Sequence, residues 1–490
     1  MPLIDDLRRL NGLRVHESSL AEAGGAVYFT ARRGEETRVG CVGDGPLTGK
    51  RIGEAGGKPV ILAPMDHGNA RVVRERLPWT APRLVGPATS IGLGDRLGLA
   101  TPGHVRAVRG TGVACVLAQQ SIREMTRTRR APDEVLDCAT WGVLQEGFRD
   151  GFGADADHLQ RPEDIDATAA AGFTMFTIDP GAHVNDGADA MTPDALGEAF
   201  GSLDLASLES SAADLKARYA GRTFPLSGGG EVAFRETDLL RAAVKYARAV
   251  AHTAAMYRHL RDTAGRQVEV EVSVDETDSP TSPAEHYFFA AELKRLGVRW
   301  VSMAPRFVGR FEKGVDYIGS LDEFRRSLAQ HVAVMRTLGP YKISIHSGSD
   351  KFSIYPLVAE LTGGLMHLKT AGTSYLEALR AVAGTDAALF RSILDFACGR
   401  YETDRATYHV SADASRVPRA AEVADADLAA LLDDFDAREV LHVTFGSVLT
   451  ADGGSRFRAP LLAALRRDEE AHYAALRRHI GRHLAGMAPR

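Results

Sequence analysis

Residues 341–356 read YKISIHSGSDKFSIYP, and this stretch decides the expected fold. Apolar and polar residues alternate from Tyr341 to His346, which is the period of a β-strand with one apolar and one polar face. In a barrel of parallel strands the apolar face packs on the outer helices, and the last inward residue stands at the carboxyl end, where chemistry is placed. His346 is expected to be that residue; a core histidine with a satisfied hydrogen bond is the alternative.

The same unit of short strand, polar turn and amphipathic helix recurs along the chain after Pro87. Eight candidate strands begin at Ala88, Gly112, Gly153, Phe173, Val268, Arg299, Tyr341 and Leu365. Eight such units predict an α/β fold, a (β/α)8 barrel of the TIM type. Helices are expected between them at residues 132–147, 162–171, 284–296, 321–338 and 352–361.

Changes in composition and the positions of structure-breaking residues divide the chain into three expected parts. Residues 1–80 are interpreted as a small N-terminal α/β region, and residues 81–372 as the barrel. The stretch near 185–237 is rich in Ala, Ser and Asp and overlong for a βα connection, so we interpret it as an insertion over the barrel mouth. Residues 373–490 are expected to be a mostly helical C-terminal region that completes the barrel.

The overall composition excludes several classes of protein. The chain has 490 residues, of which 44% are hydrophobic and 25% charged, and its formal net charge is -5. These values are typical of a globular protein and give no basis for nucleic-acid binding. No signal-peptide h-region and no run of 18 apolar residues is evident, so a cytoplasmic protein that does not enter membranes is expected. The expected partner is a small molecule; a homo-oligomer is left open.

Strand alternation also predicts which polar side chains face the barrel interior. In VEVEVSVDE, Glu271 and Asp275 face inward, and in LMHLK the inward residues are His367 and Lys369. In GADADH the parity is ambiguous, because either the two aspartates or the histidine faces inward, but at a strand end both Asp157 and His158 can reach the mouth. A buried carboxylate is costly unless it is paired, bound to a metal or catalytic.

These residues form one predicted cluster at the barrel mouth. Its members are His158, Glu271, His346 and His367, with Asp157, Asp275 and Lys369 close by. Imidazoles and a carboxylate in one cavity suit Zn, Mn, Ni, Co or Fe(II). A buried polar network without a metal is the alternative.

Further candidate residues surround this cluster. The cations that could bind an anionic substrate group are Arg306, Lys313, Lys351 and Lys369. Two more histidines that could belong to the site, His409 and His442, each sit in a β-like run. Single surface cations are usually only solvated, which is the plain alternative for the first group.

Several long motifs, in order, resemble one known family. They are GLGDRLGLATPGHVRA (from Gly92), GFGADADHLQRPEDI, GFTMFTIDPGAHV, VSVDETDSPTSP, RFVGRFEKGVDYIG, HSGSDKFSIYP, HLKTAGTSYLEA and YHVSADASRVP. Together they resemble the tagaturonate epimerase family, also called tagaturonate/fructuronate epimerases. The resemblance runs from about Gly92 to the region of Gly446 and does not extend distinctively to the first 80 residues.

The resemblance implies a divalent-metal enzyme of hexuronate catabolism that interconverts D-tagaturonate and D-fructuronate. It places the acid/base pair on Asp157 and Glu271 and metal ligands on His158 and His346. A third ligand, His367, comes from strand parity alone. The alternatives are a 4-epimerase of neutral ketohexoses such as tagatose and fructose, a metal-dependent aldolase, and a sugar-acid-binding protein without catalysis.

Overall fold

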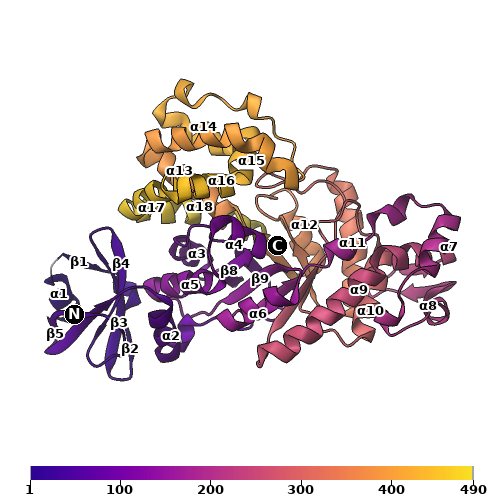
Figure 1. Ribbon diagram of the computed structural model, residues 1–490, viewed down its shortest axis with the longest axis horizontal. Coiled ribbons are helices and arrows are strands. Elements are labelled where there is room, and N and C mark those ends of the chain that lie inside the picture. The colour runs from indigo at the N-terminus through magenta and orange to yellow at the C-terminus, as the bar shows by residue number, and fades with distance from the viewer. Residues whose placement is uncertain (1, 11, 488–490) are drawn as a thin grey trace.

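The computed structural model describes residues 2–10 and 12–487. Figure 1 shows a small sheet at one end, a barrel in the centre and a group of C-terminal helices above the barrel. The helices of the insertion lie at the opposite end from the sheet. The catalytic residues expected from the sequence all belong to the central barrel.

The N-terminal region is an antiparallel sheet with two helices. Its strand order is β1-β3-β4-β6-β5, and β2 pairs with β3. The strands are β1 (Leu13–Val15), β2 (Ala21–Ala23), β3 (Ala26–Arg33), β4 (Glu36–Val42), β5 (Lys50–Ala55) and β6 (Lys58–Ala63). The helices are α1 (Pro2–Arg8) and α2 (His67–Arg76), and α2 packs on α5 (Pro132–Glu146) of the barrel.

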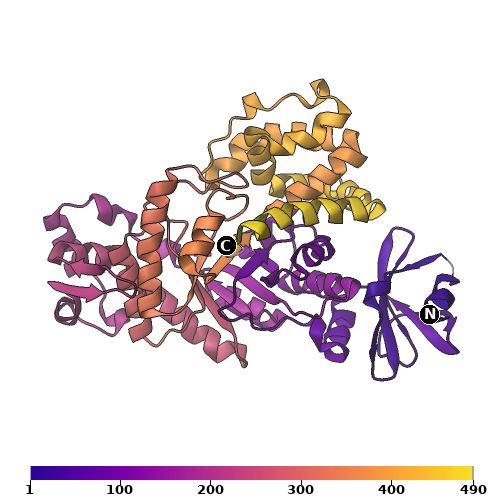
Figure 2. The same ribbon diagram turned by 180° about the vertical axis from the view of Figure 1, so that it is seen from behind.

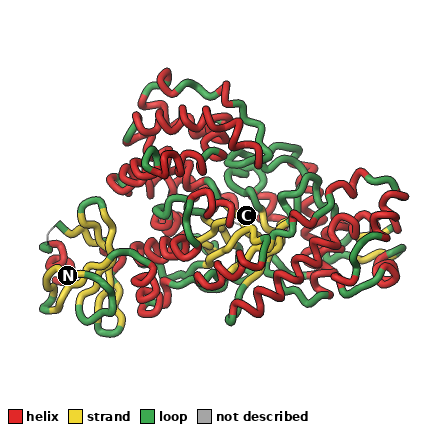
Figure 3. The backbone as a smooth tube through the Cα atoms, in the orientation of Figure 1, coloured by secondary structure: helices red, strands yellow, loops and turns green. Residues whose placement is uncertain are grey.

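Eight parallel strands close into a barrel in the order β10-β13-β14-β15-β16-β7-β8-β9. They are β7 (Ser90–Leu93), β8 (Ala114–Ser121), β9 (Gly153–Leu159), β10 (Met175–Ile178), β13 (Glu269–Ser273), β14 (Ser302–Ala304), β15 (Lys342–Ile345) and β16 (Met366–Thr370). Each coincides with one of the eight strands expected from the sequence, so the predicted fold class is confirmed. In Figure 3 the yellow strands of this barrel lie inside a ring of red helices.

The helices around the barrel carry its apolar core on their inner faces. They include α3 (Thr101–Val108), α4 (Ile122–Thr128), α6 (Pro162–Ala171), α9 (Glu236–Ala264), α10 (Pro283–Arg295), α11 (Leu321–Leu338) and α12 (Tyr355–Thr362). On β13, Val270 and Val272 are buried in this outer core, whereas Glu271 faces the barrel interior. Within residues 2–10 and 12–487 we find no helix with the length and hydrophobicity needed to cross a membrane.

The insertion packs against the outer helices. It contains α7 (Pro193–Gly201), α8 (Ala212–Tyr219) and the hairpin of β11 (Arg222–Pro225) and β12 (Glu231–Phe234). Helices α7 and α8 contact α9, and β12 contacts α10. None of its residues is among those that line the cavity at the barrel mouth described below.

The C-terminal region is helical and packs over the barrel. It comprises α13 (Thr373–Thr385), α14 (Ala387–Asp404), α15 (Phe435–Val443), α16 (Phe445–Thr450), α17 (Arg458–Arg467) and α18 (Glu469–Met487). Figure 2 shows α18 as the long yellow helix between this group and the barrel, where it packs on α3, α12 and α13.

The prediction of β-strands around His409 and His442 in the C-terminal region is wrong. His442 lies on helix α15, and His409 lies in an irregular segment between short 3-10 turns. The β-branched residues that suggested a strand, Val440 and Val443, are buried on the helix instead. Packing on neighbouring helices overrides a weak intrinsic preference of this kind.

A close helix contact yields a prediction about stability. A Cβ on Gly103 of α3 would lie 2.6 Å from Leu476 Cδ1 and 2.8 Å from Leu476 Cβ on α18. Helix propensity alone favours Gly103→Ala by up to about 1 kcal/mol. Because the contact forces α18 away, we expect the variant to lose about 1–3 kcal/mol instead.

The matched control is Gly481→Ala on α18, where nothing lies within 4 Å of the added Cβ. Its thermal midpoint should stay equal or rise, whereas that of Gly103→Ala should fall. A rise in both variants would mean that α18 does not pack this closely on α3.

Candidate active site

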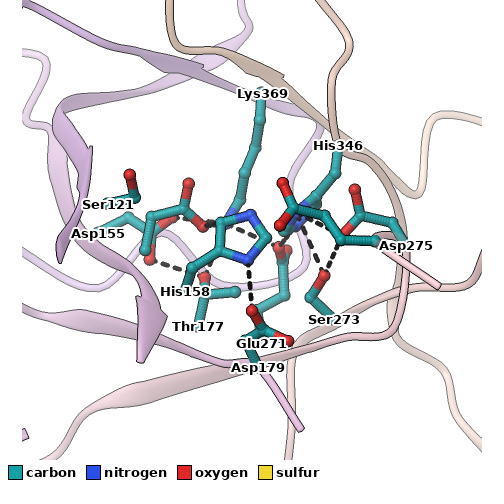
Figure 4. Close-up of polar contacts among 12 residues, drawn as sticks. Ser121, Asp155, His158, Thr177, Asp179, Glu271, Ser273, Asp275, His346 and Lys369 are labelled. Carbon is teal, nitrogen blue, oxygen red and sulfur yellow. Dashed lines mark hydrogen bonds and ion pairs between the residues drawn. The ribbon is translucent and has the colours of Figure 1, made fainter. Parts of the chain in front are cut away.

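One ammonium group joins the buried carboxylates at the mouth of the barrel. Lys369, on β16, is 3% exposed. Its Nζ lies 2.8 Å from Asp155 Oδ2, 2.7 Å from Asp157 Oδ1 and 2.9 Å from Glu271 Oε1. It also donates a hydrogen bond of 2.7 Å to Thr177 Oγ1. Side chains from β9, β10, β13 and β16 therefore meet at one charge (Figure 4).

The charge balance around Lys369 sets the protonation of these groups. Burial raises the pKa of Asp157 and Glu271, but the Lys369 ammonium and the neighbouring His346 imidazole together outweigh it, with His158 adding to the effect on Asp157, and both pKa values lie below their ordinary range. Burial raises the pKa of Asp155 to about 6 against the effect of Lys369. The carboxylates in turn raise the pKa of Lys369 well above its usual value, against the effect of its burial. Two of the three carboxyls are thus ionised and paired.

His346 stands at the carboxyl end of β15, as its strand alternation predicts. Its Nε2 contacts Glu271 Oε1, and its Nδ1 lies 3.1 Å from Asp275 Oδ1 and 3.3 Å from Ser273 Oγ. Burial and Lys369 lower the pKa of His346, but Asp275 and Glu271 overcome them and raise it to about 9. A carboxylate on each ring nitrogen fixes the orientation of the imidazole.

A break in β9 explains why both neighbouring residues face the mouth. His158 has a φ of 52°, and the register between β9 and β10 shifts at this point. Asp157 therefore reaches Lys369 while His158 turns inward too, so that its ring lies 5.1 Å from the His346 ring (Figure 4). His158 Nδ1 lies 3.0 Å from Asp179 Oδ2. Although burial lowers its pKa, Asp157 and Glu276 raise the pKa of His158 to about 10.

The donor set at the mouth fits a divalent ion. Asp157, His158 and His346 each present a ligand atom, and these atoms lie within 4.8 Å of one another. Ligands about 2.0–2.2 Å from one metal lie at most roughly 4.4 Å apart, so small side-chain movements complete the site. Asp179 and Asp275 stand behind the two imidazoles, as carboxylates do behind metal-bound histidines.

A second group of possible ligands already holds a cation. Asp350, His479 and His483 have donor atoms within 4.8 Å of one another. Arg438 Nη2 lies 2.9 Å from Asp350 Oδ2, and His483 Nε2 accepts the Asp350 backbone N–H at 3.1 Å. This network therefore holds the loop after His346 in place without requiring a metal.

The remaining predicted residues take different positions. His367 faces inward, but it pairs with Ser344 in the register, two residues below His346, and its Nδ1 hydrogen-bonds Ser90 Oγ at 2.8 Å. Burial lowers the pKa of His367 to about 3. Lys313 lines the cavity, and Arg306 is not among its lining residues.

Strand alternation does not place five residues that line the same cavity. Arg96, Gln119, Arg123 and Tyr408 are not indicated by the sequence, whereas His442 is a sequence candidate, expected on a strand; His409, the other such candidate, does not line the cavity. Gln119 Nε2 donates to Asp157 Oδ2 at 2.8 Å, and Arg123 pairs with Glu276 at 2.7 Å. Loops and the C-terminal helices supply most of them, and strand period says nothing about such segments.

Fold and site together define a (β/α)8-barrel enzyme with paired carboxylates and a metal-type cluster at the carboxyl ends of its strands. The family model for tagaturonate epimerase matches residues 16–487. The chain belongs to the tagaturonate epimerase family, a family of isomerases that act on carbohydrates.

Individual relatives match over nearly the whole chain. A tagaturonate/fructuronate epimerase of Thermotoga maritima is 42% identical over 476 residues, which is 96% of each chain. The native crystal structure of the fructuronate-tagaturonate epimerase of Cohnella laeviribosi is 39% identical, covers 98% of both chains and gives a TM-score of 0.92. A structure of that enzyme with two glycerol molecules gives 0.93 at 38% identity, with 100% of this chain and 99% of that chain covered.

The central ion-pair cluster yields a prediction about stability and pH. Lys369→Met leaves three buried carboxyls without their cation, which we expect to cost about 3–5 kcal/mol near pH 8. Their native pKa values then rise above those of the unfolded chain, so the folded state gains stability as it binds protons. The loss relative to wild type should shrink as the pH falls toward 5.

Thermal unfolding of Lys369→Met and wild type at pH 5 to 8 measures this effect. The control is Lys351→Met, because Lys351 is also buried but its Nζ donates to the backbone carbonyls of Glu312 at 2.7 Å and Ser349 at 3.0 Å. An equal loss at all pH values would contradict the proposed charge balance.

Proposed function

We propose that this protein is a divalent-metal-dependent epimerase that interconverts D-tagaturonate and D-fructuronate in hexuronate catabolism. One observation carries the proposal: Asp157, His158, His346 and Lys369 line one cavity, and Glu271 lies directly behind it in contact with both Lys369 and His346. The name of the Thermotoga maritima relative supports the substrate pair, since its likeness extends over 96% of both chains. A cytoplasmic location and a small sugar acid as the binding partner belong to the same proposal.

The difference between the two sugars restricts the mechanism. They differ at a hydroxyl-bearing carbon that is adjacent neither to the ketone nor to the carboxylate. The C–H proton at this carbon is not acidic, so simple enolisation does not invert it. A retro-aldol route does: the hydroxyl loses its proton, the carbon–carbon bond breaks, the aldehyde rotates and the bond re-forms on its other face.

Asp157 and Glu271 are suited to the two proton transfers. They lie on β9 and β13, which are separated by β10, so they can serve opposite faces of the aldehyde. Lys369 and the neighbouring imidazoles together hold both in the ionised form, in which either can accept the hydroxyl proton. After one carboxylate has accepted the hydroxyl proton, the Lys369 ammonium, within hydrogen-bond distance of both, gives one of its protons to the other carboxylate and takes up the proton from the first. The second carboxyl then protonates the new alkoxide.

His158 and His346 are the proposed metal ligands, with His367 as the third candidate. His367 Nε2 is buried and makes no hydrogen bond within the described part of the chain. The ion would be Zn, Mn, Ni, Co or Fe(II), which imidazole and carboxylate ligands suit. When bound, it would act as a Lewis acid that stabilises negative charge on the enediolate fragment, by several kcal/mol.

Lys313 is the proposed partner of the substrate carboxylate, with Arg306 as the second candidate. Lys313 Nζ hydrogen-bonds Ser347 Oγ at 2.5 Å, and the Glu276 carboxylate lies 3.8 Å away. Lys369 is also a substrate-binding candidate from the sequence. Because it already pairs with three carboxylates, we assign it to the orientation of the substrate hydroxyls and not to the substrate carboxylate.

The direct test is incubation with tagaturonate and with fructuronate, followed by NMR. We expect each acid to yield the other, and EDTA to stop the reaction until a divalent metal is restored. Exclusive turnover of tagatose, or free three-carbon products without epimerisation, would identify the rival neutral-sugar epimerase or aldolase. Binding without turnover would identify a sugar-acid-binding protein.

Two substitutions separate catalysis from metal binding. Glu271→Gln should keep the fold and the metal but lose about 10²–10⁴-fold in kcat, the usual contribution of acid–base catalysis. His346→Ala should lose the metal, which elemental analysis measures. Glu269→Gln on the same strand is the control, because Glu269 accepts the backbone N–H groups of Val85 and Gly86 below the site. Normal turnover in Glu271→Gln would remove Glu271 from the mechanism.

Removal of the cation at the mouth should raise KM. Lys313→Met loses a charged hydrogen bond to the substrate carboxylate, so we expect KM to rise about 10–100-fold with a smaller change in kcat. The same measurement on Arg306→Met distinguishes the two candidates. If KM is unchanged in both variants, the carboxylate binds elsewhere.

A further inference from the structure

A histidine from the C-terminal region reaches the catalytic cavity through a slot between two glycines. His442, on α15, lines the cavity with His158 and His346 and is 3% exposed. A Cβ on Gly372 would lie 1.9 Å from His442 Nε2, and one on Gly314 would lie 3.1 Å from its Cδ2. Any side chain at Gly372 would therefore displace the ring.

One ring nitrogen lacks a partner. His442 Nδ1 is buried and has no hydrogen-bond partner within residues 2–10 and 12–487, and Nε2 lies against Gly372, which also lines the cavity. Buried polar side chains are nearly always hydrogen-bonded in folded proteins. Because the ring lines the cavity, a substrate group there can supply a partner for Nε2, while the enclosed Nδ1 remains an unpaired acceptor.

Burial and the neighbouring charges set the protonation state of the His442 imidazole. Burial lowers the pKa of His442 well below its usual value, and the cations Arg96, Lys313 and Arg438 lower it further. The ring is thus neutral and carries one hydrogen. An enclosed N–H without an acceptor is rarer in proteins than an unpaired acceptor, so the hydrogen belongs on Nε2, at Gly372, rather than on the enclosed Nδ1.

The neighbouring charges indicate what Nε2–H binds. Arg96 and Lys313 line the same cavity. Arg96 is held by Glu124 at 2.8 Å and lies over the Phe445 ring at 3.6 Å, whereas the only ion pair of Lys313 in the described chain is the 3.8 Å contact with Glu276. A hydrogen-bond donor beside a weakly compensated cation suits an anionic oxygen.

We propose that His442 Nε2–H and Lys313 anchor the carboxylate of the sugar acid throughout the reaction. This inference rests on the proposed retro-aldol function. The base takes the hydroxyl proton, and the electron pair of the breaking carbon–carbon bond passes to the ketone-bearing half as an enediolate. The other half becomes a three-carbon aldehyde that carries the carboxylate.

The anchor explains how the chain epimerises its substrate without releasing fragments. With the carboxylate held, the aldehyde turns about the bond to its neighbouring carbon and presents its other face. The enediolate electron pair then re-forms the carbon–carbon bond, and the new alkoxide takes up a proton. His442 is thus a substrate-binding residue that favours recombination over escape of the aldehyde.

The test measures how often the fragments escape. His442→Phe keeps a ring but removes the donor, and Gly372→Ala pushes the native ring out of its slot. With tagaturonate we expect both variants to raise KM about 10–100-fold, the usual effect of losing a hydrogen bond to a charged group. Both should also release dihydroxyacetone, formed by protonation of the enediolate, at a higher ratio to epimerised product than wild type does. An enzymatic assay for dihydroxyacetone and NMR of the epimers give this ratio.

The matched control is His472→Phe. His472, on α18, is 1% exposed, and both its nitrogens lack a partner within the described residues, but it does not line the catalytic cavity. It should change neither KM nor the ratio. If both His442→Phe and Gly372→Ala keep the wild-type KM and the wild-type ratio of dihydroxyacetone to epimerised product, the proposed binding of the carboxylate by His442 is wrong. It is also wrong if His472→Phe releases as much dihydroxyacetone as these two variants do.

A binding experiment tests carboxylate binding by His442 separately from the proposed epimerase function. Wild-type turnover of tagaturonate, measured first, tests the function itself. Calorimetry then compares D-galactonate with galactitol, two unreactive six-carbon chains that differ in the carboxylate. We expect wild type to prefer galactonate and His442→Phe to lose most of that preference. Equal binding of the two by wild type would overturn the anchor whatever the reaction.

Discussion

The pairing of Lys369 with three buried carboxylates is the constraint on which the site depends. Carboxyls on strands inside a barrel are expensive to ionise, and one ammonium compensates them while remaining buried itself. The same contacts fix Asp157 and Glu271 relative to each other across three strands. The two proposed proton-transfer groups are therefore both ionised and held a set distance apart before any substrate arrives.

The C-terminal helices complete this site rather than merely covering the barrel. Arg438, on α15, donates to the Gly314 carbonyl at 2.6 Å and pairs with Asp350 at 2.9 Å, so it joins the two loops that carry Lys313 and the residues after His346. The next turn of α15 brings His442 into the cavity wall. A single helix thus positions both active-site loops and supplies a residue of its own.

Much of this arrangement could be predicted from the sequence, because strand period carries the information. Alternation places Glu271, His346 and Lys369 inside the barrel, and the structure has them there. Alternation alone is ambiguous at His158, because a positive φ and a register shift break the period where two consecutive side chains face inward, as expected for this strand end. Alternation also predicts the wrong secondary structure around His442, since a buried helix with β-branched residues has a sequence pattern similar to that of a strand.

The retro-aldol route requires that the carbon–carbon bond next to the inverted centre breaks while the C–H bond at that centre stays intact. Turnover of tagaturonate in D₂O, followed by NMR of the fructuronate formed, measures this directly. We expect the inverted carbon to keep its original hydrogen through many turnovers. Deuterium at that carbon would mean that a C–H proton is removed, and would contradict the retro-aldol assignment of Asp157 and Glu271.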